Sequence, residues 1–388
     1  MDDDSSSLLR RRRFLATGAA AALGGFAGCN GLPGGSGGGG GESGEGSSAV
    51  TMSSFRGSGP LVEGRPSLSG TSISDLPDLS GSLTVYLGGG EGGLYRDLLT
   101  LFSDIYPDFD VRPREGGTAQ LANTIVEEGD NSPADVFWAV DAGSLGSVAE
   151  ADMAATLSSS VVEDVPDEFH PTDQWVGTAG RARSVPYNTN ALSADQIPDT
   201  VMDFPDTPAL EGAMGWGPTY GAFQSFVTAM RLIEGESATR EWLQGMLDSG
   251  VSEYPDEFLT SNAVADGEIS AGFANHYYAL RVRSARSNAP LDLAFTSGDA
   301  GALINVAGAA VVQGTDQQEL AENFIHHLLT VEAQEFFATR TFAYPMIPGV
   351  PPVGGLPSID ELNPPSLDLQ ELSNVQPTLD LMRDVGVL

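Results

Sequence analysis

The chain has 388 residues, of which 41% are hydrophobic, so it is long enough to build two domains with cores of their own. Its net charge is −35 and all 18 basic residues are arginine, which leaves no basic patch to neutralise phosphates and argues against nucleic-acid binding. A single cysteine excludes an internal disulfide and a metal cage of cysteines.

The first 28 residues have the order of an export signal. Four arginines at 10–13 precede an apolar run at 14–27, which is shorter than the roughly 20 residues that span a bilayer. Phe-Ala-Gly-Cys at 26–29 is typical of a lipobox, whose cleavage leaves a lipid on Cys29. We therefore predict a twin-arginine lipoprotein signal peptide at 1–28, export by that route, and a lipid anchor on the outer face of the cell membrane. The alternative is a cysteine that merely ends a signal peptide.

The next segment, residues 29–81, is rich in Gly, Ser, Pro and Glu and poor in large apolar side chains. Such a composition cannot bury enough surface to offset the entropy of ordering, so we expect a flexible tether. The glycine run at 35–41 has no preceding strand and no following Gly-Lys-Ser/Thr, which argues against a phosphate-binding loop.

Acidic residues dominate the charge of the mature chain. Removal of residues 1–28 takes away four arginines and three aspartates, which changes the net charge from −35 to −36. Such repulsion is tolerated where salt screens it, because the Debye length falls to about 3 Å in molar salt. We interpret the acidity as adaptation to a salty habitat. The alternative, a cation-binding surface, is disfavoured because the carboxylates are dispersed and show no EF-hand spacing.

Beyond the tether, strands and helices alternate. Apolar residues alternate at 83–87 and run into a glycine turn, and a helical spacing follows at 94–105. The pattern recurs as an extended stretch at 111–114, a helix at 121–128 and a buried strand at 135–140. This alternation predicts a largely parallel α/β sheet with helices on both faces, where ligands bind beyond the carboxyl ends of the strands.

The second half of the chain begins with an extended crossing at 180–187, and a second α/β unit follows it. Residues 215–223 are typical of a strand end and turn leading into a helix at about 223–232, whose first backbone amides could hold an anion. Amphipathic helices at 319–329 and 332–339 are expected to return the chain to the first unit.

The chain resembles the ferric-ion-binding subunits of bacterial iron importers, which belong to the extracellular solute-binding proteins. The matching segments, in chain order, are Leu-Thr-Val-Tyr at 83–86, Gln-Leu-Ala at 120–122, Glu-Glu-Gly-Asp at 127–130 with Pro-Ala-Asp-Val-Phe at 133–137, Gly-Arg-Ala-Arg at 180–183, Tyr-Gly-Ala-Phe at 220–223 and Asn-His-Tyr-Tyr at 275–278. The adjacent tyrosines after the asparagine are the most specific element.

The resemblance implies an α/β fold, namely a two-lobed periplasmic-binding-protein-like clamp that closes on its ligand about a hinge of extended crossovers. We assign residues 82–180 and about 305–350 to lobe 1. Residues 181–304 and about 351–388 are assigned to lobe 2.

The resemblance also implies that Tyr277 and Tyr278 bind Fe(III) through their phenolate oxygens. Fe(III) is a hard cation that prefers oxygen, and although free tyrosine has a pKa near 10, a bound trivalent ion can remove the proton. Neighbouring tyrosines on a regular strand would point apart, so the backbone must bend there, as a loop near the hinge would allow. The alternatives are aromatic lining for an organic solute and a half-buried strand pair.

Two positions depart from the family pattern. Gly90 stands where the family commonly has a histidine, and Asp141 where it has a glutamate. Some members use a third tyrosine near the helix start of the second lobe, where this chain has Tyr220, and Glu91 is a further oxygen donor. We therefore predict an all-oxygen site of Tyr220, Tyr277 and Tyr278 with Asp141 and Glu91 as additional candidates. Tyr220 could instead be a rim aromatic, and Asp141 a helix cap.

In the family a small anion, carbonate or phosphate, often completes the iron coordination. Gly221, Ala222, Asn275 and Arg181 match the positions that hold it, and a guanidinium suits a planar oxyanion. Arg183 is expected to face the other way. For either arginine the alternative is a structural ion pair.

The expected function is therefore capture of Fe(III), with a synergistic anion, by a monomeric lipoprotein that delivers it to an ABC permease and its ATPase. The alternative ligand is a small organic or oxyanionic solute, such as a phosphonate, thiamine-like or polyamine cargo. An enzyme is not expected, because the chain has no Gly-x-Ser-x-Gly elbow, zinc-protease motif or Walker loop.

Overall fold

The computed structural model describes residues 51–89 and 93–388, and the signal peptide, Cys29, Gly90 and Glu91 lie outside these ranges. No helix in the described ranges is both long enough and apolar enough to span a membrane.

The N-terminal α/β unit follows the predicted alternation of strands and helices. Its elements are β1 (Gly81–Gly88), α2 (Leu94–Ile105), β2 (Phe109–Gly116), α3 (Thr118–Glu128), β3 (Val136–Ala139), α4 (Ala142–Glu150) and α5 (Ser159–Val162). β1 pairs in parallel with both β2 and β3, as expected for strands that are joined through helices. Helix α2 turns Leu98 and Phe102 inward, and the Tyr95 ring stacks on Trp138 with centroids 4.4 Å apart.

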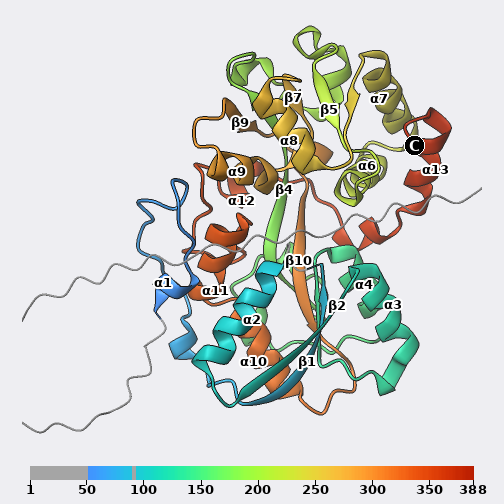
Figure 1. Cartoon of the computed structure of the whole chain (residues 1–388). Coiled ribbons are helices and arrows are strands. Elements are labelled where there is room, and N and C mark those ends of the chain that lie inside the picture. The colour runs from blue at the N-terminus through green and yellow to red at the C-terminus, as the bar shows by residue number, and fades with distance from the viewer. Residues whose placement is uncertain (1–50, 90–92) are drawn as a thin grey trace, which may run out of the picture. The chain divides into compact units, whose positions relative to one another are not determined.

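Two long strands connect this unit to the rest of the chain (Figure 1). β4 (Val176–Asn188) and β10 (Ile304–Val311) are antiparallel to each other, and β10 is also antiparallel to β3. The sheet is therefore mixed, whereas the sequence pattern predicted a largely parallel one. Pairing between segments more than 100 residues apart leaves no local signal that would have revealed this direction.

The second α/β unit is built on the far half of β4. Its elements are β5 (Met214–Trp216), α6 (Gly221–Ile233), α7 (Glu236–Asp248), β6 (Ser252–Glu253), α8 (Glu257–Asp266), β7 (Ala271–Gly272), β8 (Ala274–Asn275), α9 (His276–Ala285) and β9 (Leu291–Ala294). Within the described part of the chain the strand order is β2-β1-β3-β10-β4-β7-β5-β6, and β8 and β9 also pair with β4. Aromatic side chains fill this unit's core, with Phe226 packed edge-on to Trp242 and stacked on Phe273.

The C-terminal elements are α10 (Gln318–Leu328), α11 (Val331–Phe336), a π-helix (Phe337–Thr341), α12 (Ile359–Leu362), a 3₁₀ turn (Leu369–Ser373) and α13 (Gln376–Val385). The 3₁₀ turn packs on α4, where a side chain at Gly143 would meet the Ser373 backbone nitrogen at 2.7 Å. α13 packs instead on α6 and α7. The C-terminal segment therefore contacts both α/β units.

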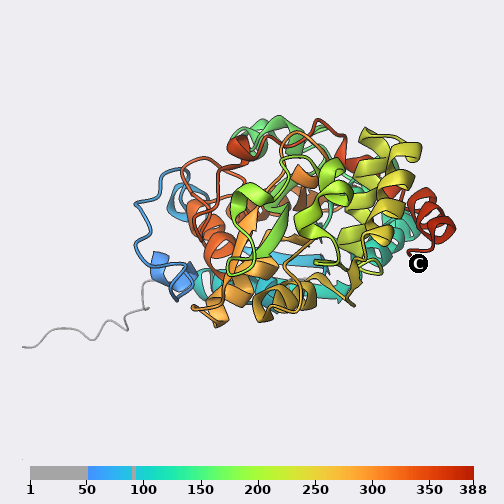
Figure 2. The ribbon, with the colours of Figure 1, turned by 90° about the horizontal axis from the view of Figure 1, so that it is seen from above.

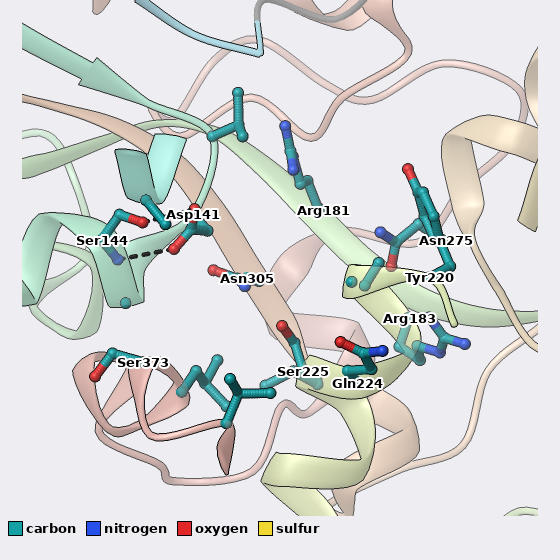
Figure 3. A pocket seen from close by; sticks show the side chains of 18 of the residues that line it. Asp141, Ser144, Arg181, Arg183, Tyr220, Gln224, Ser225, Asn275, Asn305 and Ser373 are labelled. Carbon is teal, nitrogen blue, oxygen red and sulfur yellow. Dashed lines mark hydrogen bonds between the residues drawn. The ribbon is translucent and has the colours of Figure 1, made fainter. Parts of the chain in front are cut away.

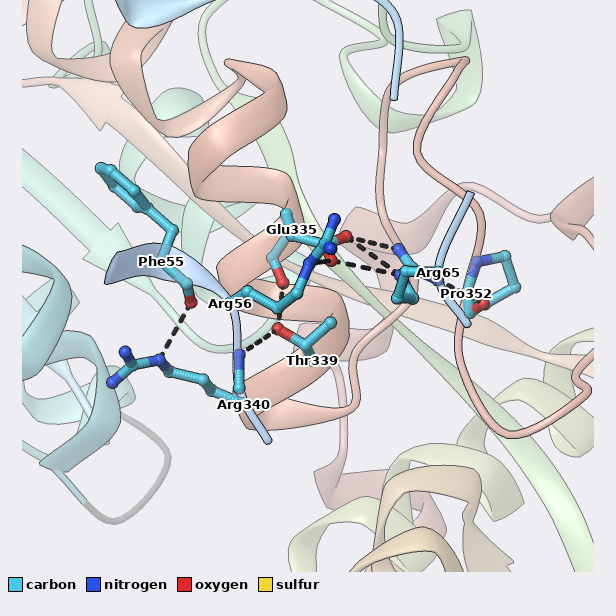
Figure 4. A network of polar contacts seen from close by, with 8 residues as sticks. Phe55, Arg56, Arg65, Glu335, Thr339, Arg340 and Pro352 are labelled. Atoms are coloured by element: carbon cyan, nitrogen blue, oxygen red, sulfur yellow. Dashed lines mark hydrogen bonds and ion pairs between the residues drawn. The ribbon is translucent and has the colours of Figure 1, made fainter. Parts of the chain in front are cut away.

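Residues 51–80, which we call the N-terminal strap and which include α1 (Met52–Phe55), pack against α11 and the π-helix (Figure 4). Glu335 of α11 is fully buried and accepts hydrogen bonds from Arg56 at 2.6 Å and Arg65 at 2.5 Å. Arg340 donates to the Phe55 carbonyl at 2.9 Å, and the Phe55 side chain is fully buried. Over these residues the structure differs from the expected flexible tether.

The strap departs from the prediction because its partners are distant in sequence. Phe55 and Leu79 are isolated apolar residues in a polar stretch, and Arg65 lies 270 residues before Glu335. Composition alone detects neither contact. Seen from above, the strap and α13 lie at opposite sides of the molecule (Figure 2).

Candidate functional site

The candidate site lies where β4 changes its pairing partners. Up to Ala182 the strand pairs with β10, and from Arg183 onward it pairs with β8, β9 and β7. The register places Arg181 opposite Asn305 and Arg183 opposite Asn275. Side chains from distant parts of the sequence are therefore gathered at one point along β4.

A cavity of about 610 Å³ opens at this point. One wall comes from α3, the end of β3 and α4, and carries Asn123, Asp141, Ser144 and Ser147. The other wall comes from the start of α6 and the start of α9, and carries Tyr220, Gly221, Ala222, Asn275 and Tyr277. Figure 3 shows Asp141 and Ser144 facing Tyr220 and Asn275 across the cavity, with Asn305 between them.

The three predicted tyrosine ligands come together. The hydroxyl groups of Tyr220 and Tyr278 are in hydrogen-bond contact, and the rings of Tyr277 and Tyr278 lie 4.3 Å apart between centroids. Tyr220 and Tyr277 line the cavity, and Tyr278 joins them through its contact with Tyr220. Three phenol oxygens can thus approach one ion from a single wall.

The tyrosine pair lies at a helix start and not in a loop. Asn275 is the N-cap of α9, so Tyr277 and Tyr278 belong to the first turn of that helix. Successive residues on a helix project about 100° apart, whereas on a strand they project to opposite faces. The first helical turn therefore provides the bend that the sequence argument required.

Burial raises the pKa of the Tyr278 hydroxyl, and the neighbouring Tyr277 and Tyr220 raise it further. Tyr278 is therefore a neutral phenol at physiological pH in the absence of a cation. A trivalent cation in contact with the oxygen would reverse this preference, since ligand deprotonation is coupled to metal binding.

Two guanidinium groups lie near the tyrosine rings. The Arg281 guanidinium carbon is 5.0 Å from the ring centroid of Tyr277 and 5.5 Å from that of Tyr278, and the Arg181 carbon is 6.0 Å from Tyr277. These contacts are within the range of cation–π attraction. Arg281 did not emerge from the sequence argument, although its position four residues after Tyr277 places both on one helix face.

The predicted anion-binding residues also line the cavity: Arg181, Gly221, Ala222 and Asn275. Gly221 and Ala222 are the first residues of the 13-residue helix α6, whose leading N–H groups have no partner within the helix. The Asn275 amide nitrogen lies 3.4 Å from the Tyr277 hydroxyl. The anion positions are therefore adjacent to the phenol oxygens.

Asp141 is the N-cap of α4. Its Oδ1 accepts a hydrogen bond from the Ser144 backbone N–H at 2.7 Å, and its Oδ2 from the Ser144 hydroxyl at 3.1 Å. The capping alternative is thus confirmed. A carboxylate has about four acceptor sites, so capping leaves room for a further contact. A ligand role for Asp141, on the wall facing the tyrosines, stays a prediction.

Other residues that line the cavity were not predicted from the sequence. Asn305 comes from β10, Gln224 and Ser225 from α6, and Ser373 from the C-terminal 3₁₀ turn. None belongs to a motif, and only the folded chain brings them together. Arg183 also lines the cavity rather than facing the other way, and its ion-pair alternative is confirmed by a buried contact with Glu257.

The donor set limits the chemistry of the site. Among the described residues, no cluster of three or more His, Cys, Asp or Glu side chains could hold a metal ion. The phenol oxygens that line this cavity suit a hard cation of high charge.

A family description matches residues 131–366, that of the bacterial extracellular solute-binding proteins. The chain belongs to this family. The match covers the second α/β unit and the part of the first unit from β3 onward. The family is one of binding proteins, which agrees with the expectation that the chain is not an enzyme.

Relatives of this solute-binding protein include iron-binding members. The major ferric iron-binding protein of Neisseria meningitidis serogroup A is 31% identical over 274 residues, covering 69% of this chain and 82% of the relative. Iron uptake protein A2 of Synechocystis is 31% identical over 289 residues, covering 70% and 82%. The iron-bound structure of HitA from Pseudomonas aeruginosa superposes with a TM-score of 0.69 at 31% identity, covering 79% of this chain and 99% of HitA.

The predicted α/β clamp fold of this solute-binding protein is confirmed by the last comparison. About a fifth of the chain has no counterpart in HitA, although HitA is matched almost end to end. The full chain is thus longer than the HitA chain that it matches.

Proposed function

We propose that this solute-binding protein captures Fe(III) in the cavity between its two walls and delivers it to an ABC permease and its ATPase. The observation that carries the proposal is the convergence of three phenols, with the Tyr220 and Tyr278 hydroxyls in contact and Tyr277 alongside. The ferric iron-binding relatives from Neisseria and Synechocystis support it. Asp141, across the cavity, and Glu91 are candidate fourth ligands.

We propose further that a small anion, such as carbonate or phosphate, completes the coordination of the iron. The start of α6 offers backbone N–H groups at Gly221 and Ala222, and Arg181 and Asn275 line the same cavity. A hydroxycarboxylate could occupy the same place, since the iron-bound relative from Trichodesmium carries citrate.

The strand arrangement supports a clamp that closes about a hinge. We assign residues 82–180 and about 305–350 to one lobe, and residues 181–304 and about 351–388 to the other. β4 and β10 serve as the hinge, because β4 exchanges its partners between Ala182 and Arg183.

Export by the twin-arginine route and a lipid on Cys29 complete the proposal, and they rest on the order of the N-terminal sequence alone. Cys29→Ala is expected to move the protein from the membrane fraction to the soluble exported fraction. A variant that remains in the membrane fraction would contradict the lipid anchor.

The iron proposal is tested by colour. Purified protein given Fe(III) and bicarbonate is expected to show a visible tyrosinate-to-iron charge-transfer band. Tyr277→Phe/Tyr278→Phe should abolish the band, and Tyr254→Phe, outside the cavity lining, should keep it. A colourless protein whose melting temperature does not respond to iron would reject Fe(III) in favour of an oxyanionic or organic solute.

A further inference from the structure

The carboxylate of Glu257 is buried beside the tyrosine pair. Glu257 is the first residue of α8 and is fully buried. One of its oxygens accepts a hydrogen bond from Arg183, and the other accepts from the backbone N–H of Asn275 at 2.8 Å. Both carboxylate oxygens are therefore committed to residues that line the cavity.

Asn275 links this carboxylate to the phenols. It is the N-cap of α9, and its amide nitrogen lies 3.4 Å from the Tyr277 hydroxyl. Its backbone also pairs with Arg183 in the sheet. The position from which the tyrosine pair projects is thus set by Glu257 and Arg183 together.

Arg183 extends the linkage to the third tyrosine. Its guanidinium carbon lies 4.8 Å from the ring centroid of Phe226 and 5.6 Å from that of Phe223, both on α6. α6 begins directly after Tyr220. One ion pair therefore joins the strand β4 to the helices that carry all three phenols.

Glu257 neutralises the buried charge of Arg183. The arginine side chain is only 2% exposed, and its Nε and Nη2 atoms are buried without a hydrogen-bond partner. Among the described residues Arg183 pairs with Glu257, and removing one partner of a buried ion pair is strongly unfavourable. Removal of Glu257 would leave a positive charge beside the cavity proposed to receive Fe(III).

We propose that Glu257 is a positioning residue for the iron site: it fixes Asn275 at the start of the tyrosine helix and neutralises Arg183 at the cavity wall. The inference rests on the proposed function, and it makes the affinity for Fe(III) depend on a side chain that does not touch the metal.

The test is Glu257→Gln, measured by Fe(III) competition with a chelator and by the charge-transfer band. Glutamine keeps one acceptor oxygen but has no charge. Its amide N–H₂ group would face a donor group, either that of Arg183 or that of Asn275. Affinity is expected to fall by about 10- to 100-fold, as is usual for partners that orient metal ligands, and the band should shift.

Two further variants separate positioning from general stability. Arg183→Met/Glu257→Gln removes both charges and should recover most of the lost affinity. Asp266→Asn breaks the exposed pair with Arg286, which joins the other ends of α8 and α9 at 2.6 Å, and should leave affinity and band unchanged.

A Glu257→Gln protein with a lower melting temperature but wild-type affinity and band would overturn the inference. If Glu257→Gln does not fold, Glu257→Asp is the deciding variant, because its shorter carboxylate keeps the charge but withdraws from one partner. An altered charge-transfer band in Glu257→Asp supports the positioning role. A wild-type band and affinity in Glu257→Asp reject it. A colourless wild-type protein would instead reject the proposed function.

Discussion

At the scale of single residues, the protonation of the Tyr278 phenol has a consequence for iron binding. Because burial and the neighbouring tyrosines raise the pKa of Tyr278, the apo site holds the Tyr278 phenol protonated at neutral pH. The raised pKa favours the folded apo protein below the unfolded pKa of about 10, and this contribution is lost as the pH rises through the folded value. Iron binding must therefore release protons.

We predict that one proton is released for each ligating phenol, so Fe(III) affinity should rise by about tenfold per pH unit for each proton released. Tyr220→Phe should lower the number of released protons by one if Tyr220 is a ligand. Titration of unbuffered protein with a defined iron chelate, followed by pH-stat, measures the number. An unchanged number in the variant would assign Tyr220 to the rim.

Asp141 allows capping and metal binding to be separated, because asparagine caps a helix about as well as aspartate. Asp141→Asn should leave the free energy of unfolding within about 0.5 kcal/mol of wild type, whereas Asp141→Ala should lower it by about 1 kcal/mol. If Asp141 binds iron, both variants should also lose Fe(III) affinity.

Asp256→Asn is the matched control, since Asp256 caps α8 by accepting from Leu259 N–H at 2.7 Å and does not line the cavity. Full affinity in Asp141→Asn would restrict Asp141 to its capping role.

At the scale of elements, the strap makes the largest difference between expectation and structure. Glu335 is fully buried, Arg65 is 5% exposed and Arg56 is 31% exposed at the side chain. Glu335→Gln leaves the buried Arg65 without a counter-ion, so we expect a loss of about 3 kcal/mol in the free energy of unfolding.

Arg56→Met should cost about 1 kcal/mol or less, because its pair with Glu335 is partly exposed. Asp380→Asn, which breaks the exposed pair with Arg383, is the control and should have no measurable effect. Denaturant unfolding measures all three variants. A Glu335→Gln protein as stable as wild type would show that the strap contributes little to the fold.

Sequence patterns predicted the local elements well and the long-range ones poorly. The spacing of Leu98 and Phe102 located α2, and the Tyr-Gly-Ala-Phe segment located the start of α6, because both depend on residues close in sequence. The antiparallel direction of β10 and the strap on Glu335 depend on partners far along the chain. The site divides in the same way: the tyrosines came from a motif, but Asn305 and Glu257 came only from the fold.

At the scale of the whole molecule, the net charge of −35 should make stability depend on salt. Dispersed carboxylates repel one another when the Debye length is about 10 Å, at 0.1 M salt, and are screened when it is about 3 Å, at 1 M. We predict that the melting temperature rises steeply with KCl and then levels off. A linear rise that continues to several molar would indicate general salt exclusion instead of charge screening.

The central claim is that one Fe(III) ion binds to the phenol oxygens of the cavity wall. The most direct measurement is a crystal structure of the iron-loaded protein with an anomalous difference map recorded at the iron edge. We predict a single strong peak in contact with the hydroxyl oxygens of Tyr220, Tyr277 and Tyr278. A map with no peak in this cavity, or with iron bound only to surface carboxylates, would contradict it.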